Sequence, residues 1–352
     1  MQLLLEKGAN PNLKDKWNTT PLMVASKRSS GSAVRLLLKY GADVHQSDTN
    51  MKTAIHFSCA GSNQETIKLL LESGADPNAK NKWNTSPLMI SSKQGSTTSV
   101  RLLLQHGADL HQRDENLRTP LHYASESGHD HVMQFLLKSG ADPNPKDRYK
   151  STPLMIVSKK DDVSSARILL QYGADVNLCD IDNETALHHA ARAGNHKIVN
   201  LLLESDADPN AKNKLNISPL IFASKNGNVS CVKLLLQHGA NVHQCCDCNE
   251  NALQYASKNG RLEVMKLLLK VGADPNTKNF RNSSSLMSAV NGGHLSCVEL
   301  LLRHGADVHQ CDEESNSALH LASLGGHREI VNLLQRSTDP NYKENNRDLL
   351  VR

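Results

Sequence analysis

The sequence has few aromatic residues and no long apolar run. Trp, Tyr and Phe make up 3% of its 352 residues. The apolar runs are mostly leucine triplets, far shorter than the roughly 20 residues that a membrane span requires. The N-terminal stretch MQLLLEKGAN lacks a charged region followed by a long apolar segment, so it is not a signal peptide. These absences argue against a membrane as a partner.

Strong net charge and catalytic motifs are also missing. The formal net charge of +4 is too small by itself to indicate binding to nucleic acid or to a membrane surface. We find no HExxH, Walker loop, G-x-S-x-G or kinase motif, and therefore predict no enzymatic activity, no small-molecule substrate and no cofactor.

The eight cysteines, without a signal peptide, predict free thiols in a reducing compartment. We expect the cytoplasm, with the nucleus as the alternative. The cluster most similar to a metal site is HQCCDC, with His243, Cys245, Cys246 and Cys248. Zinc sites usually need two separated ligand pairs, and no second pair lies nearby in the sequence. We therefore expect no metal.

What the sequence does contain is a repeat of 33 residues, without insertion or deletion across ten copies. Its opening residue begins the pattern TPLM-x-(A/S)-S, which a leucine triplet and GAD follow. A fixed period of this length predicts a solenoid, in which each repeat packs only on its neighbours. Repeats one to ten open at Thr20, Thr53, Ser86, Thr119, Thr152, Thr185, Ser218, Asn251, Ser284 and Ser317.

This pattern resembles the ankyrin repeat, whose core is T-P-L-H-x-A in a 33-residue unit. The resemblance implies an all-α repeat solenoid of two helices and a hairpin-like loop per repeat. It also implies a non-catalytic scaffold or adaptor that binds proteins on the concave face formed by loop tips and first helices. We expect a partial repeat at 1–12, ten repeats in one continuous solenoid at 13–342, and a polar tail at 343–352. The chain opens in the middle of a repeat, which favours truncation over a half-repeat acting as a cap.

Each repeat carries the signals of two helices. The opening Thr, Ser or Asn is predicted to cap the first helix, and Pro often follows at the first helical position. A glycine is predicted to end the second helix at GAD, because glycine readily adopts positive φ. Two residues before the opening position the family usually has Gly, and here Asn is commonest. Four repeats have neither Gly nor Asn at this position, and we predict an altered turn in each of them. The residues are Met51, Leu117, Lys150 and Ser315. Histidines at the fourth position of T-x-L-H are predicted to bond between repeats, namely His56, His122, His188 and His320.

A second period of 66 residues separates odd from even repeats. Over the eight residues before each opening position, Lys and Arg minus Asp and Glu total +9 in the odd repeats and −8 in the even ones. Basic and acidic loop tips therefore alternate. No rule of the fold requires this alternation.

The few aromatic residues follow the same register. Trp17, Trp83 and Tyr149 share one position in the tips of odd repeats. Because exposed Trp, Tyr and Arg are typical of binding hot spots, we predict a partner-binding row that contacts an extended or acidic protein segment. The alternative is that these aromatics pack on adjacent tips while the alternating charges neutralise their neighbours. The candidate row comprises Lys16, Trp17, Lys27, Arg28, Lys82, Trp83, Lys93, Arg148, Tyr149, Lys159, Lys160, Lys214, Leu215, Lys225, Phe280 and Arg281.

Three further functions stay open at this point. Basic residues interleaved with aromatics suit single-stranded nucleic acid, but acidic tips interrupt the stripe, which makes that partner less favoured. The chain could also be the targeting arm of a larger enzyme such as a kinase or ubiquitin ligase. Finally, its basic and acidic ends could associate head to tail.

Overall fold

The computed structural model describes residues 1–337, and the proposed tail at 343–352 lies outside this part of the chain. Across the described residues the chain forms 21 helices and no named strand. Four isolated β-bridges occur instead, each just before a first helix of an even repeat, as between Ser47 and Thr53. The predicted all-α repeat architecture is confirmed.

Each repeat contributes a first helix of seven or eight residues. The first helices are α2 (Pro21–Lys27), α4 (Ala54–Ala60), α6 (Pro87–Gln94), α8 (Pro120–Ser127), α10 (Pro153–Lys159), α12 (Ala186–Ala193), α14 (Pro219–Asn226), α16 (Ala252–Lys258), α18 (Ser285–Asn291) and α20 (Ala318–Leu324).

A second helix, which carries the leucine triplet in most repeats, follows each first helix. The second helices are α3 (Gly31–Lys39), α5 (Gln64–Glu72), α7 (Thr97–Gln105), α9 (Asp130–Lys138), α11 (Val163–Gln171), α13 (His196–Glu204), α15 (Val229–Gln237), α17 (Leu262–Lys270), α19 (Leu295–Arg303) and α21 (Arg328–Ser337), with α1 (Gln2–Glu6) preceding repeat one.

Contacts between residues divide the chain into two compact units. Unit 1 comprises Met1–Val157 and Asp162–Asp175, and unit 2 comprises Ser158–Asp161 and the chain from Val176 onward. Within unit 1, helices α2, α4, α6 and α8 pack in series, as do α3, α5, α7, α9 and α11. Within unit 2, helices α12 to α20 with even labels pack in series, as do α13 to α21 with odd labels. One continuous solenoid across 13–342 stays a prediction.

The first helices begin as the sequence predicts. The Thr20 hydroxyl accepts a hydrogen bond from the Met23 N–H at 3.3 Å, and Pro21 occupies the first turn, where no N–H is needed. Ser218 and Pro219 repeat this arrangement in α14. The second helices end at the GAD glycine with positive φ, for example 85° at Gly107.

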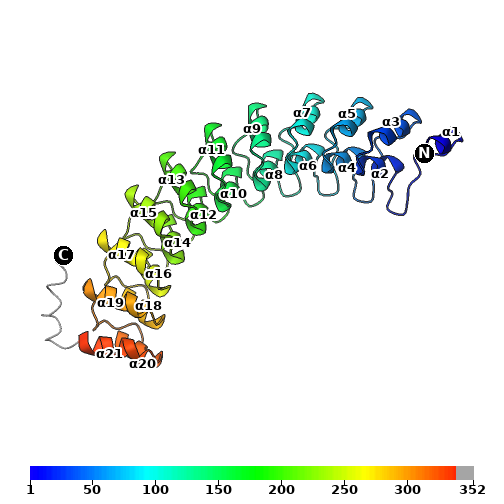
Figure 1. Cartoon of the computed structure of the whole chain (residues 1–352). Helices are drawn as coiled ribbons and strands as arrows, with labels where there is room; N and C mark the ends of the chain where they lie inside the picture. The colour runs from blue at the N-terminus through cyan, green and yellow to red at the C-terminus, as the bar shows by residue number, and fades with distance from the viewer. Residues whose placement is uncertain (338–352) are drawn as a thin grey trace. The chain divides into compact units, whose positions relative to one another are not determined.

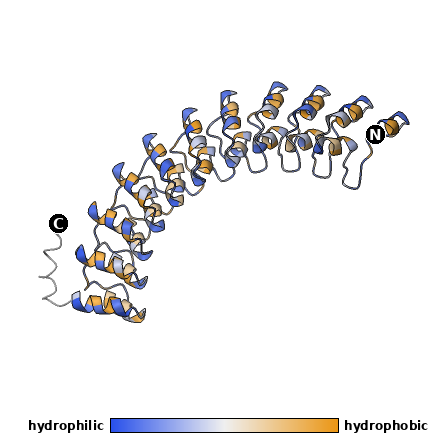
Figure 2. Ribbon diagram, in the orientation of Figure 1, coloured by the Kyte–Doolittle hydropathy of each residue, from blue (hydrophilic) through white to orange (hydrophobic). Residues whose placement is uncertain are grey.

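Each unit buries apolar side chains between its helices. The leucines of the triplet that face the first helices are fully buried, as at Leu37, Leu70 and Leu103. In Figure 2 the hydrophobic residues lie mostly within the helices, while hydrophilic residues gather at helix ends. Small residues such as Ala124 and Ser91 are also completely buried on the first helices, where they permit close packing between repeats.

Three of the four predicted inter-repeat histidine bonds are present within the described residues. His122 Nδ1 lies 3.1 Å from the Thr119 N–H, and its Nε2 lies 3.2 Å from the Ser151 carbonyl oxygen of the next repeat. His56 and His188 make the same pair of contacts. His320 makes the same Nδ1 contact with Ser317 of its own repeat, while the position equivalent to Ser151 in the repeat after it lies outside the described residues. The first three histidines therefore lock adjacent repeats together.

The 66-residue period has a structural basis at the helix caps. The Asn78 side chain donates to the Gly107 carbonyl at 2.9 Å and accepts from the Asp109 N–H at 2.8 Å. At the equivalent place four of the five even repeats have histidine, as at the exposed His45 and His111, and only the sixth repeat has asparagine, Asn177. The asparagines that bridge two caps in this way are Asn12, Asn78, Asn144, Asn177, Asn210 and Asn276.

The predicted altered turns are wrong. Met51, Leu117, Lys150 and Ser315 adopt φ values between 56° and 65°, the same left-handed conformation as the asparagines at this position. The hydrogen bonds of the tip fix this conformation whatever the side chain, and they outweigh the cost of about 1–2 kcal/mol that a non-glycine residue meets there.

Candidate functional site

The loop tips are small, tightly bonded turns. We define a tip as the five residues that precede the N-cap, with a base residue first. In the first tip, Asp15 Oδ1 accepts from the N–H groups of Trp17 and Thr19 at 2.9 and 2.8 Å. The Asn18 N–H donates to the Asp15 carbonyl at 2.9 Å. The backbone bond from Thr19 is the main cause that lowers the pKa of Asp15. The ten tips are 15–19, 48–52, 81–85, 114–118, 147–151, 180–184, 213–217, 246–250, 279–283 and 312–316.

Neighbouring tips are also bonded to each other through the backbone. In unit 1 the Thr49 N–H donates to the Trp17 carbonyl at 3.0 Å, and the Glu115 N–H donates to the Trp83 carbonyl at 3.1 Å. In unit 2 the Asp247 N–H donates to the Leu215 carbonyl at 3.0 Å. Within each unit these bonds fix a tip relative to the next one, so the side chains at the middle of each tip stand on a stiff support.

The predicted aromatic residues lie at these middle positions and face solvent. Trp17 and Tyr149 are each 58% exposed, and Trp83 is 40% exposed. In unit 2 Leu215, at the same position, is 58% exposed, and Phe280, one position earlier in its tip, is 74% exposed. Their backbone groups take part in the hydrogen bonds of the tips, while their side chains project into solvent. The exposure favours a binding role over packing between tips.

The basic residues of the row divide into several groups. Lys16 Nζ lies 4.2 Å from the centroid of the Trp17 ring. Arg148 instead donates to the Glu115 carbonyl of the preceding tip at 2.6 Å. Arg281 Nε lies 3.7 Å from a Glu313 carboxylate oxygen. The Arg281–Glu313 ion pair supports the alternative in which alternating tips neutralise each other, whereas Arg148 bonds to an uncharged backbone carbonyl. Further exposed lysines and an arginine lie at tips and helix ends, namely Lys27, Arg28, Lys82, Lys93, Lys159, Lys160, Lys214 and Lys225.

Sequence reasoning missed residues that the fold places beside this row. Lys52, from an even repeat, lies 5.7 Å from the centroid of the Trp83 ring. Tyr123, on a first helix, is half-buried and donates its hydroxyl to Asp114 Oδ2 at 2.7 Å. Arg192 stacks its guanidinium 3.9 Å from the centroid of Phe222. One sequence signal could have indicated these residues. The position four residues after the opening residue is aromatic in several repeats, namely at Phe57, Tyr123, Phe222 and Tyr255.

A buried ionic cluster lies at the base of the sixth tip. His189 Nε2 is 3.0 Å from Asp180 Oδ2, and its Nδ1 is 3.5 Å from Glu184 Oε2. Burial lowers the pKa of His189 to about 4. Burial would raise the pKa of Glu184, but its contacts with Arg192 hold it below the ordinary value.

Three ligand atoms of this cluster lie within 4.8 Å of one another, close enough for a metal ion. However, Arg192 and Asn213 already bond to the two oxygens of Glu184. The two nitrogens of His189 also contact different carboxylates, so a single ion could not replace both contacts. We therefore interpret the cluster as a hydrogen-bonded network around the Glu184–Arg192 ion pair, with His189 neutral.

All eight cysteines are free thiols, as predicted. Burial raises the pKa of Cys59 to about 12 and that of Cys231 to about 11, so both stay protonated at neutral pH. In the HQCCDC segment, Cys246 is buried with its sulfur 3.7 Å from the Tyr255 hydroxyl, whereas Cys248 is exposed.

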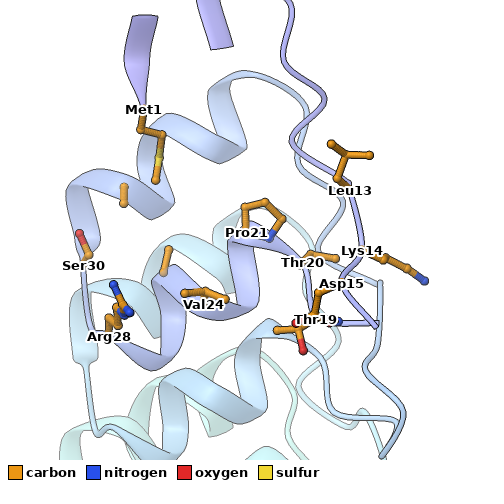
Figure 3. A pocket seen from close by; sticks show the side chains of 12 residues that line it. Met1, Leu13, Lys14, Asp15, Thr19, Thr20, Pro21, Val24, Arg28 and Ser30 are labelled. Carbon is orange, nitrogen blue, oxygen red and sulfur yellow. Dashed lines mark hydrogen bonds between the residues drawn. The ribbon is translucent and has the colours of Figure 1, made fainter. Parts of the chain in front are cut away.

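A hollow of about 580 Å³ lies beside the first helix of repeat one. Its wall includes Met1, Leu13, Pro21, Val24 and Arg28, which Figure 3 labels. In the following repeats the corresponding face of a first helix contacts the first helix before it, as α4 contacts α2. The hollow is therefore the place that a preceding first helix would take in the repeat pattern, and we assign no ligand to it.

A family model described as ankyrin repeats matches residues 1–81, 78–147, 144–213, 211–279 and 278–344, which together span nearly the whole chain. The chain belongs to the ankyrin-repeat family. Ankyrin repeats are generally modules of protein–protein interaction. No curated protein matches the chain. Within the described residues, every helix is too short or too polar to cross a membrane.

Proposed function

We propose that this ankyrin-repeat protein is a non-catalytic scaffold or adaptor that binds other proteins through its tips and first helices. The observation that carries the proposal is the exposure of Trp17, Trp83 and Tyr149 at equivalent places on stiff tips of unit 1. Large aromatic side chains supply much of the energy of protein interfaces. Since backbone bonds already order the tips, binding loses little conformational entropy.

The charges near these rings indicate the character of the partner. Lys16 and Lys52 lie over the faces of Trp17 and Trp83. Lys16 is exposed and Lys52 is half-buried, and their ammonium groups favour a partner that brings carboxylates to the same place. Single-stranded nucleic acid is the less favoured candidate, because acidic tips lie between the basic ones and would repel a continuous phosphate backbone. The same surface would also allow a role as the targeting arm of a kinase or ubiquitin ligase, or association between copies of the chain.

The free thiols support a reducing compartment as the site of action. We place the protein in the cytoplasm, with the nucleus as the alternative.

The test is a pull-down from nuclease-treated lysate with the full chain. The variant Trp17→Ala, Trp83→Ala, Tyr149→Ala is compared with Val229→Ala, Val271→Ala, which truncates exposed apolar residues at the ends of second helices. Circular dichroism first confirms that both variants fold. We expect the tip variant to lose proteins that the wild type and the control capture. Identical captures by all three would contradict the proposal.

A further inference from the structure

Four consecutive repeats place a basic residue at the same position near the end of the first helix, and all four residues belong to unit 2. Each residue lies seven positions after the opening residue of its repeat. Three of them are exposed, and the side chain of the fourth, Arg192, is 39% exposed. We call them the cationic row: Lys159, Arg192, Lys225 and Lys258.

Helix stability alone does not account for this row. A cation near a helix C-terminus is favourable by about 0.3–1 kcal/mol, because it opposes the helix dipole. The same position holds Ala60 in α4, Glu126 in α8, Asn291 in α18 and Leu324 in α20, and those helices form equally well. The fold therefore tolerates neutral and acidic residues at a place where four repeats in succession have a basic one.

The helices that carry the row add no acidic side chain of their own. The first helices α10, α12, α14 and α16 contain no Asp or Glu. Arg192 stacks on Phe222 of the next repeat, and Lys225 Nζ lies 5.9 Å from the ring centroid of Tyr255 in the repeat after that. Aromatic rings of successive repeats thus support cations of the preceding ones. Glu184, at the base of this surface, neutralises Arg192 in part.

The spacing of the row selects one kind of partner. Packed helices lie about 8–10 Å apart, so the row offers a positive charge at about that interval. A peptide in the extended polyproline II conformation has three residues per turn and advances about 3.1 Å per residue, so every third side chain faces the same way at intervals of about 9 Å. We propose that unit 2 binds an extended acidic peptide with Asp or Glu at every third position, four of them over ten residues. This inference rests on the proposed protein-binding function and specifies the partner of one unit.

The neighbouring tips favour a peptide over a nucleic acid. The sixth and eighth tips, which precede the helices of Arg192 and Lys258, contain acidic residues such as Asp182 and Asp247. A peptide can place neutral residues between its carboxylates and so avoid these charges. A nucleic-acid strand carries a phosphate at every nucleotide and cannot.

The experiment measures binding of labelled ten-residue peptides to the full chain by fluorescence polarisation. One peptide has Glu at positions 1, 4, 7 and 10 among Ser and Gly. A second has the same composition with its four Glu residues contiguous. We expect the spaced peptide to bind at least fivefold more tightly, and its affinity to fall as salt rises. Equal affinities, or tighter binding of a single-stranded oligonucleotide of four phosphates, would overturn the proposal.

Two variants locate the site. Lys225→Ala with Lys258→Ala should weaken binding of the spaced peptide about fivefold or more, since each exposed charge pair contributes up to about 1 kcal/mol. The control, Lys233→Ala with Lys270→Ala, removes two exposed lysines from second helices of the same unit and should leave affinity unchanged. Equal effects of the two variants would contradict the assignment.

A variant that gains a second peptide site gives a test whose positive result cannot come from unfolding. In unit 1 the same position reads Lys27, Ala60, Lys93 and Glu126. Ala60→Lys with Glu126→Lys would give this unit four basic residues in succession. We expect the stoichiometry to rise from one peptide to two, and an unchanged stoichiometry would count against the spacing rule. If these tests fail while the tip variant still loses its captured proteins, the general binding function stands and only the peptide assignment falls.

Discussion

At the scale of single residues, the repeats show which side chains can replace one another. In the eighth tip, cysteine takes the base position that Asp or Asn occupies in the other nine. No side-chain acceptor is then available for the backbone N–H groups of Cys248 and Glu250. In the fourth repeat, by contrast, Asp114 accepts two backbone bonds and a third from the Tyr123 hydroxyl.

The substitution Cys246→Asp should therefore stabilise repeat eight. Tyr255 stands where Tyr123 stands in repeat four, so an aspartate would gain all three bonds. We expect the free energy of unfolding to rise by about 1–2 kcal/mol, measured by urea denaturation. Cys248→Asp, which adds the same charge at an exposed position of the same tip, should give no increase. A gain from both variants would show that charge, and not the turn, is responsible.

The buried histidines should make stability depend on pH. Burial lowers the pKa of His56 and of His122 to about 4, below the value of about 6.5 in the unfolded chain. The unfolded state then binds more protons between these values, so stability falls as the pH drops from about 6.5 to 4. Each histidine should cost up to about 3 kcal/mol at the lower limit.

The measurement is urea unfolding at several pH values. His56→Gln with His122→Gln serves as the comparison, because Gln254 fills this position in repeat eight and bonds to both the Asn251 N–H and the Ser283 carbonyl. The variant should fold at pH 7 and lose less stability on acidification. An identical pH dependence in both proteins would contradict the assignment.

At the scale of elements, the tip is the unit that holds the candidate site. Its five residues adopt one conformation in all ten repeats, with a positive φ at the fourth residue. Side chains as different as Met51 and Lys150 are forced into this conformation. The strain is therefore local, and a residue that tolerates positive φ should relieve it.

Leu117→Asn tests this at a leucine that is 45% exposed. Its φ is 61°, a value that asparagine adopts more readily. We expect stabilisation of about 0.5–1 kcal/mol in thermal or urea unfolding. Leu117→Val should destabilise, since a β-branched residue is poorly suited to positive φ. A stability order of Val above Asn would show that burial of the side chain matters more than the backbone.

At the scale of the whole molecule, close helix packing in the described chain joins only the same or adjacent repeats. The stability of such an array is approximately a sum over repeats and their interfaces. Damage should therefore stay near its origin. This property would let the two units carry different binding surfaces without compromising each other.

Hydrogen exchange measured by mass spectrometry can test this locality. His122→Ala leaves the Thr119 N–H and the Ser151 carbonyl without their partner, which should lower the local opening free energy by about 2–4 kcal/mol. Exchange should quicken in repeats four and five and stay unchanged in α16 to α19. Uniformly faster exchange along the chain would indicate a single cooperative unit.

The sequence by itself determined the family, the helix pairs and their caps, because a 33-residue period repeats every local signal ten times. Thr20 with Pro21 signals a helix start through local chemistry, and the resemblance to the ankyrin repeat implies that His122 bonds to the next repeat. The tertiary structure alone decided which side chains meet between tips. Lys52 and not Lys82 lies over Trp83, and Arg148 bonds to the Glu115 carbonyl. These contacts depend on the conformations of long side chains from adjacent repeats. The spacing of residues along the chain does not determine those conformations.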